Sequence, residues 1–267
     1  MKTFLPLRLY MALLVLAAVA PPASAGDLTY DRILIPIAVA PASAGAAGSA
    51  WSTLFKAYNA GSSPVENDLP KDPACLNIST FCPNWLYPGY LAVRPFNEPL
   101  AEPGFIAHLQ APTDGVWFNL LGSGVSALGS RFSFEIPVVR EKGFFDRGFY
   151  LIGVPIAEDA RVMLRIYDLD SKLDARVRVR AHSVINGRTV AETVLTLNPP
   201  AVDPYHNKPG YVQALGLRSI LPTLPPPVDD SDEVELEIVP ETPGLQIWGF
   251  ISITNSATLN VRTIVPR

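Results

Sequence analysis

Residues 161–181 read RVMLRIYDLDSKLDARVRVRA, and this stretch decides the predicted fold. Its apolar residues lie two positions apart, as Val162, Leu164 and Ile166 do in the first part, and valines alternate with arginines in the second. This spacing is typical of extended strands with one buried face. Residues 168–171, Asp-Leu-Asp-Ser, separate the two strands and are predicted to form a hairpin connection, because Asp and Ser favour turns.

The same alternation recurs in short runs along most of the chain, bounded by Pro, Gly, Asn and Asp. Helical periodicity is absent beyond the first 25 residues. The 27 prolines punctuate these runs and disfavour long helices. The chain is therefore predicted to be all-β and antiparallel.

A weak internal repeat divides the chain. Residues 51–59 resemble residues 161–168, and the Trp-bearing stretch 112–118 resembles 242–248. Each copy offers an opening strand, a hairpin, a middle section and a Trp-bearing strand, which is the content of a seven-strand sandwich. The repeat predicts two tandem β-sandwich modules with a boundary near Gly129: residues 26–129 and 130–267.

The first 25 residues have the composition of a secretory signal peptide. A short positive segment precedes an apolar run at residues 9–20, and Ala23-Ser24-Ala25 forms a small-residue cleavage site. The apolar run is too short to span a bilayer. A cleaved signal peptide at residues 1–25 predicts a protein secreted to the extracellular space or to a periplasm.

Several strings resemble one family. The strings IPIAV at 35–39, FEIPVVRE at 134–141, ARVMLRIYDLDSKLDARVRVR at 160–180 and PGLQIWGFISITN at 243–255 are similar to a group of uncharacterised secreted bacterial proteins with tandem immunoglobulin-like β-sandwich modules. The resemblance extends over nearly all of the mature chain. It implies an immunoglobulin-like fold and a secreted location, and it implies no catalytic residues.

The charge of the chain and the length of its apolar runs argue against nucleic acid and against a membrane span. The formal net charge is −4, whereas nucleic acid requires clustered Lys and Arg on the protein that binds it. No apolar run after the signal segment reaches 18 residues, so no membrane span is predicted once the signal peptide is removed. The sequence therefore predicts no nucleic-acid partner and no membrane span after signal cleavage.

The two cysteines, Cys75 and Cys82, are predicted to form a disulfide, because cysteines this close in an exported chain usually pair. The alternative, a metal site, requires more ligands than this segment offers. No metal ligand is therefore assigned.

Aromatic residues next to the cysteines are the candidate ligand surface. Trp85, Tyr87 and Tyr90 alternate with prolines, and rigid loops with Trp and Tyr suit a glycan or a protein partner. The alternative is that Trp85 and its neighbours close one end of the first module. The other tryptophans lie in strand patterns and are predicted to be core residues: Trp51, Trp117 and Trp248.

Two charged strands are predicted to fix the register of the second module. One carries Arg176, Arg178, Arg180 and His182 on one face, and the other carries Glu233, Glu235 and Glu237. In an immunoglobulin-like module the Glu strand is expected beside the strand with Arg161 and Arg165, where opposite charges pair across the sheet. The alternative function of the Arg strand is an anion-binding stripe.

Reactive groups do not converge in the sequence. The three histidines are far apart, and only His206 lies in a loop with an acid and a phenol nearby. Acidic turns near Asp168 and Asp229 make calcium a possible cofactor, but Asp also favours turns for local reasons. No catalytic residue is assigned, and no other cofactor is predicted.

These observations together predict a secreted, non-catalytic binding or structural protein of the extracellular space or cell envelope. Its partner is predicted to be a glycan or a protein surface, contacted by loops such as 66–90 and 198–209. The alternative function is a secreted hydrolase with a site between the two modules.

Overall fold

The computed structural model describes residues 29–39, 43–44, 50–69, 85–95, 104–125, 129, 131–157, 160–198, 209–227, 232–255 and 261–267. The predicted signal peptide, the cysteine pair Cys75 and Cys82, and His206 lie outside the described residues. The predictions made for these segments therefore stay predictions.

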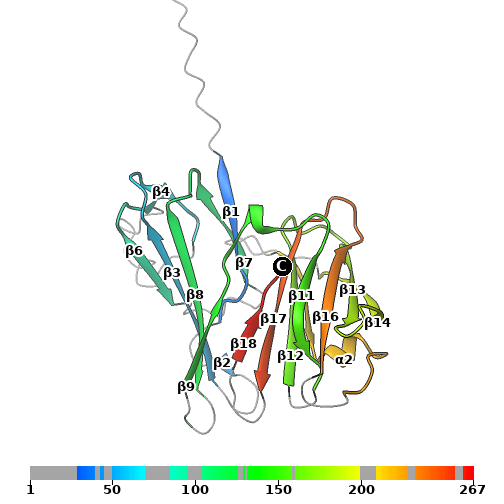
Figure 1. Cartoon of the computed structure of the whole chain (residues 1–267). Coiled ribbons are helices and arrows are strands. Elements are labelled where there is room, and N and C mark those ends of the chain that lie inside the picture. Colours follow the sequence, from blue (N-terminus) through cyan, green and yellow to red (C-terminus); the bar gives the residue numbers. More distant parts are fainter. Residues whose placement is uncertain are drawn as a thin grey trace, which may run out of the picture.

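The described residues form antiparallel strands almost throughout, which confirms the all-β prediction (Figure 1). The first strands are β1 (Tyr30–Ile35), β2 (Ser43–Ala44), β3 (Ala50–Asn59), β4 (Val65–Glu66), β5 (Trp85–Leu86), β6 (Leu91–Pro95), β7 (Phe105–Gln110), β8 (Val116–Val125), β9 (Arg131–Ile136) and β10 (Val139–Arg140). The later strands are β11 (Phe149–Pro155), β12 (Ala160–Asp168), β13 (Arg176–Ser183), β14 (Thr189–Thr196), β15 (Gly210–Leu215), β16 (Glu233–Pro240), β17 (Ile247–Asn255) and β18 (Val261–Ile264). The helical turns η2 (Glu141–Gly143) and α2 (Leu217–Ile220) complete the described part, and neither is long enough to cross a membrane.

Strands β1 to β10 form the N-terminal unit, which we define as residues 30–140. One sheet has the order β10-β1-β7, and a second has the order β2-β3-β8-β9, with β6 also paired to β3. Apolar residues of both sheets are buried, consecutively at residues 33–35 of β1 and in alternation along β3, and they include Ile33, Phe55 and Leu120 on β8. The apolar core of the unit therefore lies between two antiparallel layers.

Strands β11 to β18 form the C-terminal unit, which we define as residues 149–264. Its sheets have the orders β11-β16-β13-β14 and β15-β12-β17-β18, and a second apolar core lies between them. Leu217, Leu221 and Leu224, in α2 and the turn after it, belong to this core.

The two units share one pattern of strand pairing. The pairs β1–β7, β3–β6, β3–β8 and β8–β9 have counterparts in β11–β16, β12–β15, β12–β17 and β17–β18. Register is also shared, because Tyr58 lies opposite Trp117 in one unit and Tyr167 lies opposite Trp248 in the other. This recurrence agrees with the internal repeat in the sequence. Residues 131–140 follow the predicted boundary near Gly129, and they pair with β8 and β1.

The predicted alternation is confirmed where one face of a strand meets a core. Val162, Leu164 and Ile166 on β12 are buried in the C-terminal core, as are Val177 and Val179 on β13. The apolar residues at two-residue spacing thus face inward, as amphipathic strands require.

Two predicted connections are wrong. Strands β12 and β13 lie in different sheets, so residues 169–175 cross between layers and do not close a hairpin. The Glu strand β16 pairs with β13 and β11, and β12 pairs with β15 and β17 instead. The physical reason is shared: turn-forming residues and alternation specify a turn and a buried face, but leave the partner strand open.

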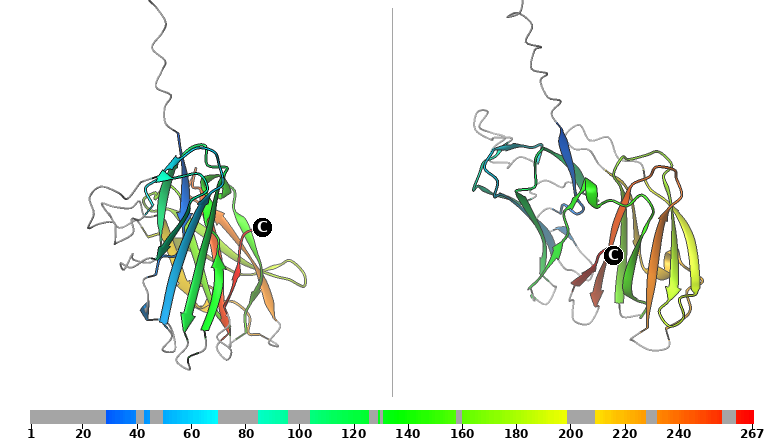
Figure 2. Two further views of the ribbon diagram at one scale, coloured as in Figure 1. Left: turned by 90° about the vertical axis from the view of Figure 1, so that its left-hand side faces the viewer. Right: turned by 45° about the horizontal axis from the view of Figure 1, so that its top comes forward.

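The two units are joined through the outer face of β12 and β17. Tyr167 and Trp248 point away from the C-terminal core and are buried with Phe250 in the core of the N-terminal unit. The Tyr167 hydroxyl donates a hydrogen bond to the carbonyl oxygen of Pro36 at 2.7 Å. The sheet with β12 and β17 lies between the N-terminal unit and the outer sheet of the C-terminal unit (Figures 1 and 2).

Candidate functional site

The outer face of β3 and β8 carries exposed aromatic side chains. Tyr58 lies opposite Trp117 on one side and Leu91 on the other, and Val93 follows Leu91 two positions along β6. Trp117 is 69% exposed and Tyr58 is 40% exposed. We call Tyr58, Leu91, Val93 and Trp117 the aromatic face; its sheet faces the viewer in the left panel of Figure 2.

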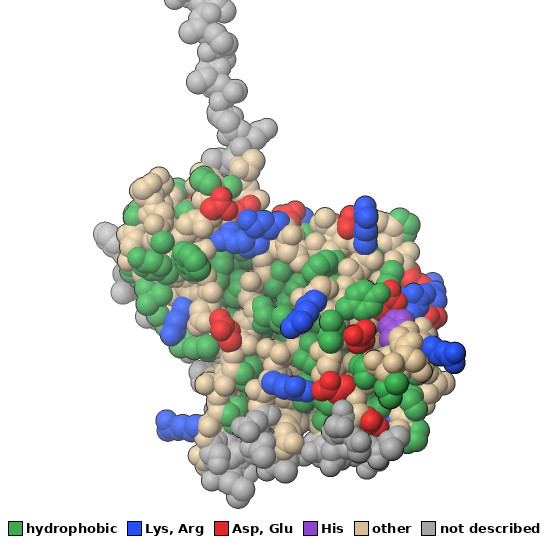
Figure 3. Space-filling model, viewed as in Figure 1, with side chains coloured by type: hydrophobic (Ala, Val, Ile, Leu, Met, Phe, Trp, Pro, Cys, Tyr) green, Lys and Arg blue, Asp and Glu red, His purple; other side chains and the backbone are tan. Residues whose placement is uncertain are grey.

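Strand geometry explains why these side chains point outward. Successive side chains of a strand point to opposite faces, and the neighbours of Tyr58 and Trp117, including Ala57 and Val116, are buried in the core. On the side of the molecule that Figure 3 shows, hydrophobic patches are interspersed with charged side chains. The aromatic face is therefore the outer face of a sheet whose inner face packs on the core of the N-terminal unit.

Polar groups border the aromatic face along the strands. Lys56 lies opposite Val93 and Asn119, and the Asn119 side-chain amide donates to a Glu135 carboxylate oxygen at 2.8 Å. Farther along the sheet the hydroxyls of Ser52 and Ser123 lie 2.9 Å apart. The border mixes both signs of charge with neutral polar groups, so it attracts neither a strongly acidic nor a strongly basic partner.

The predicted ligand residues Trp85, Tyr87 and Tyr90 lie at the end of the same sheet and are all exposed, Trp85 by 38%. We call these three residues the aromatic turn. The residue that closes the core here is Leu86, which is buried, so the exposed position of Trp85 favours a contact surface over a closing role. Whether the three residues bind a ligand stays a prediction.

Asn59 attaches the aromatic turn to the aromatic face. Its buried side-chain amide donates to the carbonyls of Ser63 at 2.8 Å and Leu86 at 2.7 Å, and its carbonyl oxygen accepts the amide of Gly61 at 2.9 Å. Its backbone accepts from Gly89 at 2.7 Å. Asn59 therefore holds both surfaces at one end of the sheet.

The prediction that three tryptophans are core residues is only partly confirmed. Trp248 is buried, Trp51 is half-buried against Phe132 and Phe134, and Trp117 is exposed, so the prediction for Trp117 is wrong. Trp117 alternates with the buried residues of its own strand, and this alternation is the signal from which its outward position could have been predicted. Tyr58 was missed for the same reason.

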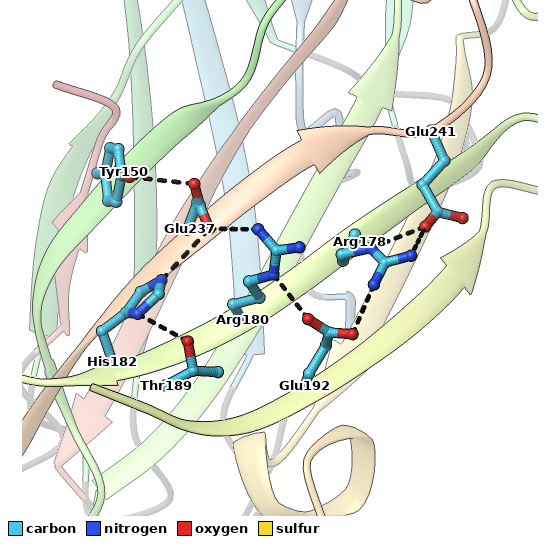
Figure 4. Close-up of polar contacts among 8 residues, drawn as sticks. All are labelled: Tyr150, Arg178, Arg180, His182, Thr189, Glu192, Glu237 and Glu241. Atoms are coloured by element: carbon cyan, nitrogen blue, oxygen red, sulfur yellow. Dashed lines mark hydrogen bonds and ion pairs between the residues drawn. The ribbon is translucent and has the colours of Figure 1, made fainter. Parts of the chain in front are cut away.

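A ladder of ion pairs covers the outer face of β11, β16, β13 and β14 (Figure 4). Arg178 contacts Glu192 at 2.6 Å and also Glu241, while Arg180 contacts Glu192 at 2.6 Å and Glu237 at 3.1 Å. Arg176 contacts Glu241 at 3.3 Å. Because these three arginines are neutralised by carboxylates of neighbouring strands, the ladder supports a role in register and not an anion-binding stripe.

Glu237 is the branching point of the ladder. It accepts hydrogen bonds from the Tyr150 hydroxyl at 3.0 Å and from Arg180, and its carboxylate lies 3.3 Å from the His182 Nε2. Partial burial acts to raise the pKa of Glu237, but the hydrogen bonds outweigh it and hold that pKa below its ordinary value. The hydrogen bond to Glu237 in turn raises the pKa of Tyr150.

Glu237→Gln is expected to reduce the acid sensitivity of the protein. Because the folded chain lowers the pKa of Glu237, the unfolded chain binds a proton first as the pH falls. The stabilisation is complete above the ordinary Glu pKa of about 4.3 and is lost as the pH falls through the folded value. Tm measured from pH 7 to pH 3 should fall less steeply in the variant, and Tyr150→Phe, which keeps the carboxylate, should be intermediate. Parallel curves for Glu237→Gln and the wild type would contradict the assignment.

The acidic turn at Asp168 is used by the backbone. One Asp168 carboxylate oxygen accepts the amide of Asp170 at 3.0 Å and the other accepts the amide of Lys172 at 2.5 Å. Burial raises the pKa of Asp168. Among the described residues no group of three or more His, Cys, Asp or Glu side chains is placed to hold a metal ion, and Asp229 lies outside them.

Charged groups at the junction of the two units pair with one another. Arg32 contacts Glu141 at 2.7 Å and Asp170 at 2.8 Å, and the hydrogen bonds that Arg32 donates to Glu141 hold the pKa of Glu141 below its ordinary value. Nearby, the His108 Nδ1 lies 2.8 Å from Asp68. The contact between Arg32 and Asp170 joins the two units, whereas the contact between His108 and Asp68 lies within the N-terminal unit. The aromatic face and the aromatic turn are therefore the candidate site. Comparison of the chain with protein-family models, curated proteins and solved structures finds no match.

Proposed function

We propose that this chain is a secreted, non-catalytic binding protein of the extracellular space or cell envelope, and that its partner lies on the aromatic face. The observation that carries the proposal is the exposure of Trp117 beside Tyr58 on the outer face of β3 and β8. Clustered exposed apolar side chains mark interaction sites. Trp and Tyr supply large contact areas for little loss of side-chain entropy.

The aromatic turn extends the proposed binding surface. Trp85, Tyr87 and Tyr90 are exposed and are attached to β3 through Asn59, directly after Tyr58. The surface as a whole suits both classes of partner that the sequence predicts, a glycan and a protein surface.

Secretion and module type are parts of the same proposal. The composition of residues 1–25 supports a signal peptide, and the repeated strand pairing supports tandem β-sandwich modules. The immunoglobulin-like assignment rests on the family resemblance alone and stays a prediction. The alternative, a hydrolase with a site between the modules, has less support, because Tyr167 and Trp248 fill the described junction.

Trp117→Ala is expected to reduce retention of the mature chain on a cell-envelope extract by about tenfold or more, since a central Trp commonly contributes over 1.4 kcal/mol to an interface. The measurement is a quantitative pull-down with the purified mature chain. The matched control is Ile185→Ala, because Ile185 is 91% exposed but lies on the C-terminal unit. Equal retention of Trp117→Ala and the wild type would reject the proposal.

A further inference from the structure

We propose that the partner of the aromatic face is a β-sandwich domain of another protein, which packs on this face as the N-terminal unit packs on the C-terminal unit. The inference rests on the proposed function and names its partner. It is carried by the equivalence of two Tyr–Trp pairs within the chain.

The two pairs occupy the same place in the two units. Tyr58 on β3 lies opposite Trp117 on β8, and Tyr167 on β12 lies opposite Trp248 on β17. In both units the Tyr strand is the central strand that pairs with the Trp strand, and the Trp strand then pairs with the last strand of the sheet. All four side chains therefore belong to the outer face of the equivalent sheet.

The burial of the two pairs is opposite. Tyr167 is fully buried and Trp248 is 4% exposed, because the N-terminal unit covers them and Pro36 accepts a hydrogen bond from the Tyr167 hydroxyl. Tyr58 and Trp117, in contrast, are 40% and 69% exposed. Within this chain, a folded β-domain therefore buries an outer sheet face that carries a Tyr–Trp pair.

The aromatic face lies at the end of the arrangement of the two units. The core of the N-terminal unit takes up Tyr167 and Trp248, and the core of the C-terminal unit takes up Leu217 and Leu221 of its own α2 segment. The outer face of β3 and β8 is therefore the terminal face of a two-unit stack. Terminal faces of stacked repeats are normally polar, so the exposed Tyr58 and Trp117 are unusual side chains for this position.

The chemistry of the inferred partner follows from the covered pair. It should offer an apolar core open at one side to Trp117, and a backbone carbonyl placed to accept the Tyr58 hydroxyl as Pro36 accepts that of Tyr167. A second copy is not able to cover the aromatic face in this arrangement, since its N-terminal core already contains Tyr167 and Trp248. The partner is therefore a different protein.

The experiment is site-specific cross-linking followed by a binding measurement. A photoreactive benzophenone residue is placed at position 117 of the full chain, and this variant is produced in cells of the source organism so that it meets its own cell envelope. The control carries the same residue at position 185. The expected result is one protein adduct at position 117 whose linked peptide belongs to a β-domain. With that protein purified, Trp117→Ala should weaken binding by about tenfold or more, and Tyr58→Phe by several-fold.

Each other outcome overturns the inference, and the outcomes separate it from the proposed function. An adduct with a second copy, a protease-resistant adduct with polysaccharide, or a purified adduct protein that binds Trp117→Ala as tightly as the wild type would reject a β-domain of another protein as the partner. A Trp117-dependent loss in the pull-down would then still support the proposed binding function. The absence of both an adduct and a Trp117-dependent loss would reject both. Unchanged Tm of Trp117→Ala verifies that the variant is folded.

Discussion

Trp248→Ala is expected to lower the free energy of unfolding by about 3–5 kcal/mol, the usual cost of removing a fully buried aromatic side chain. The indole of Trp248 stacks with Tyr167 at a centroid distance of 6.3 Å and contacts Phe250 at 5.6 Å. Since these rings belong to the sheet of one unit and the core of the other, both units should lose stability together. Chemical denaturation followed by far-ultraviolet circular dichroism measures the change.

The matched control is the equivalent residue of the other unit. Trp117→Ala should change the free energy of unfolding by no more than about 1 kcal/mol, because an exposed strand position contributes mainly its β propensity. Similar losses in the two variants would contradict the assignment of Trp248 to the junction. The assignment would also be contradicted if the two units unfolded in separate transitions and Trp248→Ala shifted only one of them.

Asn59→Ala is expected to destabilise the chain by about 2–3 kcal/mol and to weaken binding at the aromatic face. The substitution leaves the carbonyl of Leu86 and the amide of Gly61 without their side-chain partner, and the bond to Leu86 is buried. An unsatisfied buried polar group costs about 1–3 kcal/mol. Thermal unfolding and the envelope pull-down measure the two effects.

Asn119→Ala serves as the control for Asn59→Ala. Asn119 lies on the same sheet, but its contact with Glu135 is exposed, so the change should stay within about 0.5 kcal/mol. A loss for Asn59→Ala no larger than that for Asn119→Ala would show that Asn59 does not hold the aromatic turn.

The candidate site was predicted in part. Trp85, Tyr87 and Tyr90 stood out in the sequence because aromatic residues alternate with prolines there, and all three are exposed. Tyr58 and Trp117 were not recognised, because each lies in a strand whose other face is strongly apolar. The pairing that places them side by side joins residues 59 positions apart in the chain, and no local pattern specifies it.

The all-β class and the inward faces of strands such as β12 and β13 could be predicted from the sequence, because both depend on spacing within a few residues. Only the tertiary structure decided which strands pair and which outer faces are covered. Trp117 and Trp248 occupy equivalent places in the repeat, yet one is 69% exposed and the other is buried. The difference arises because burial of an outer face depends on a second domain packing on it, and alternation within a strand holds no information about that neighbour.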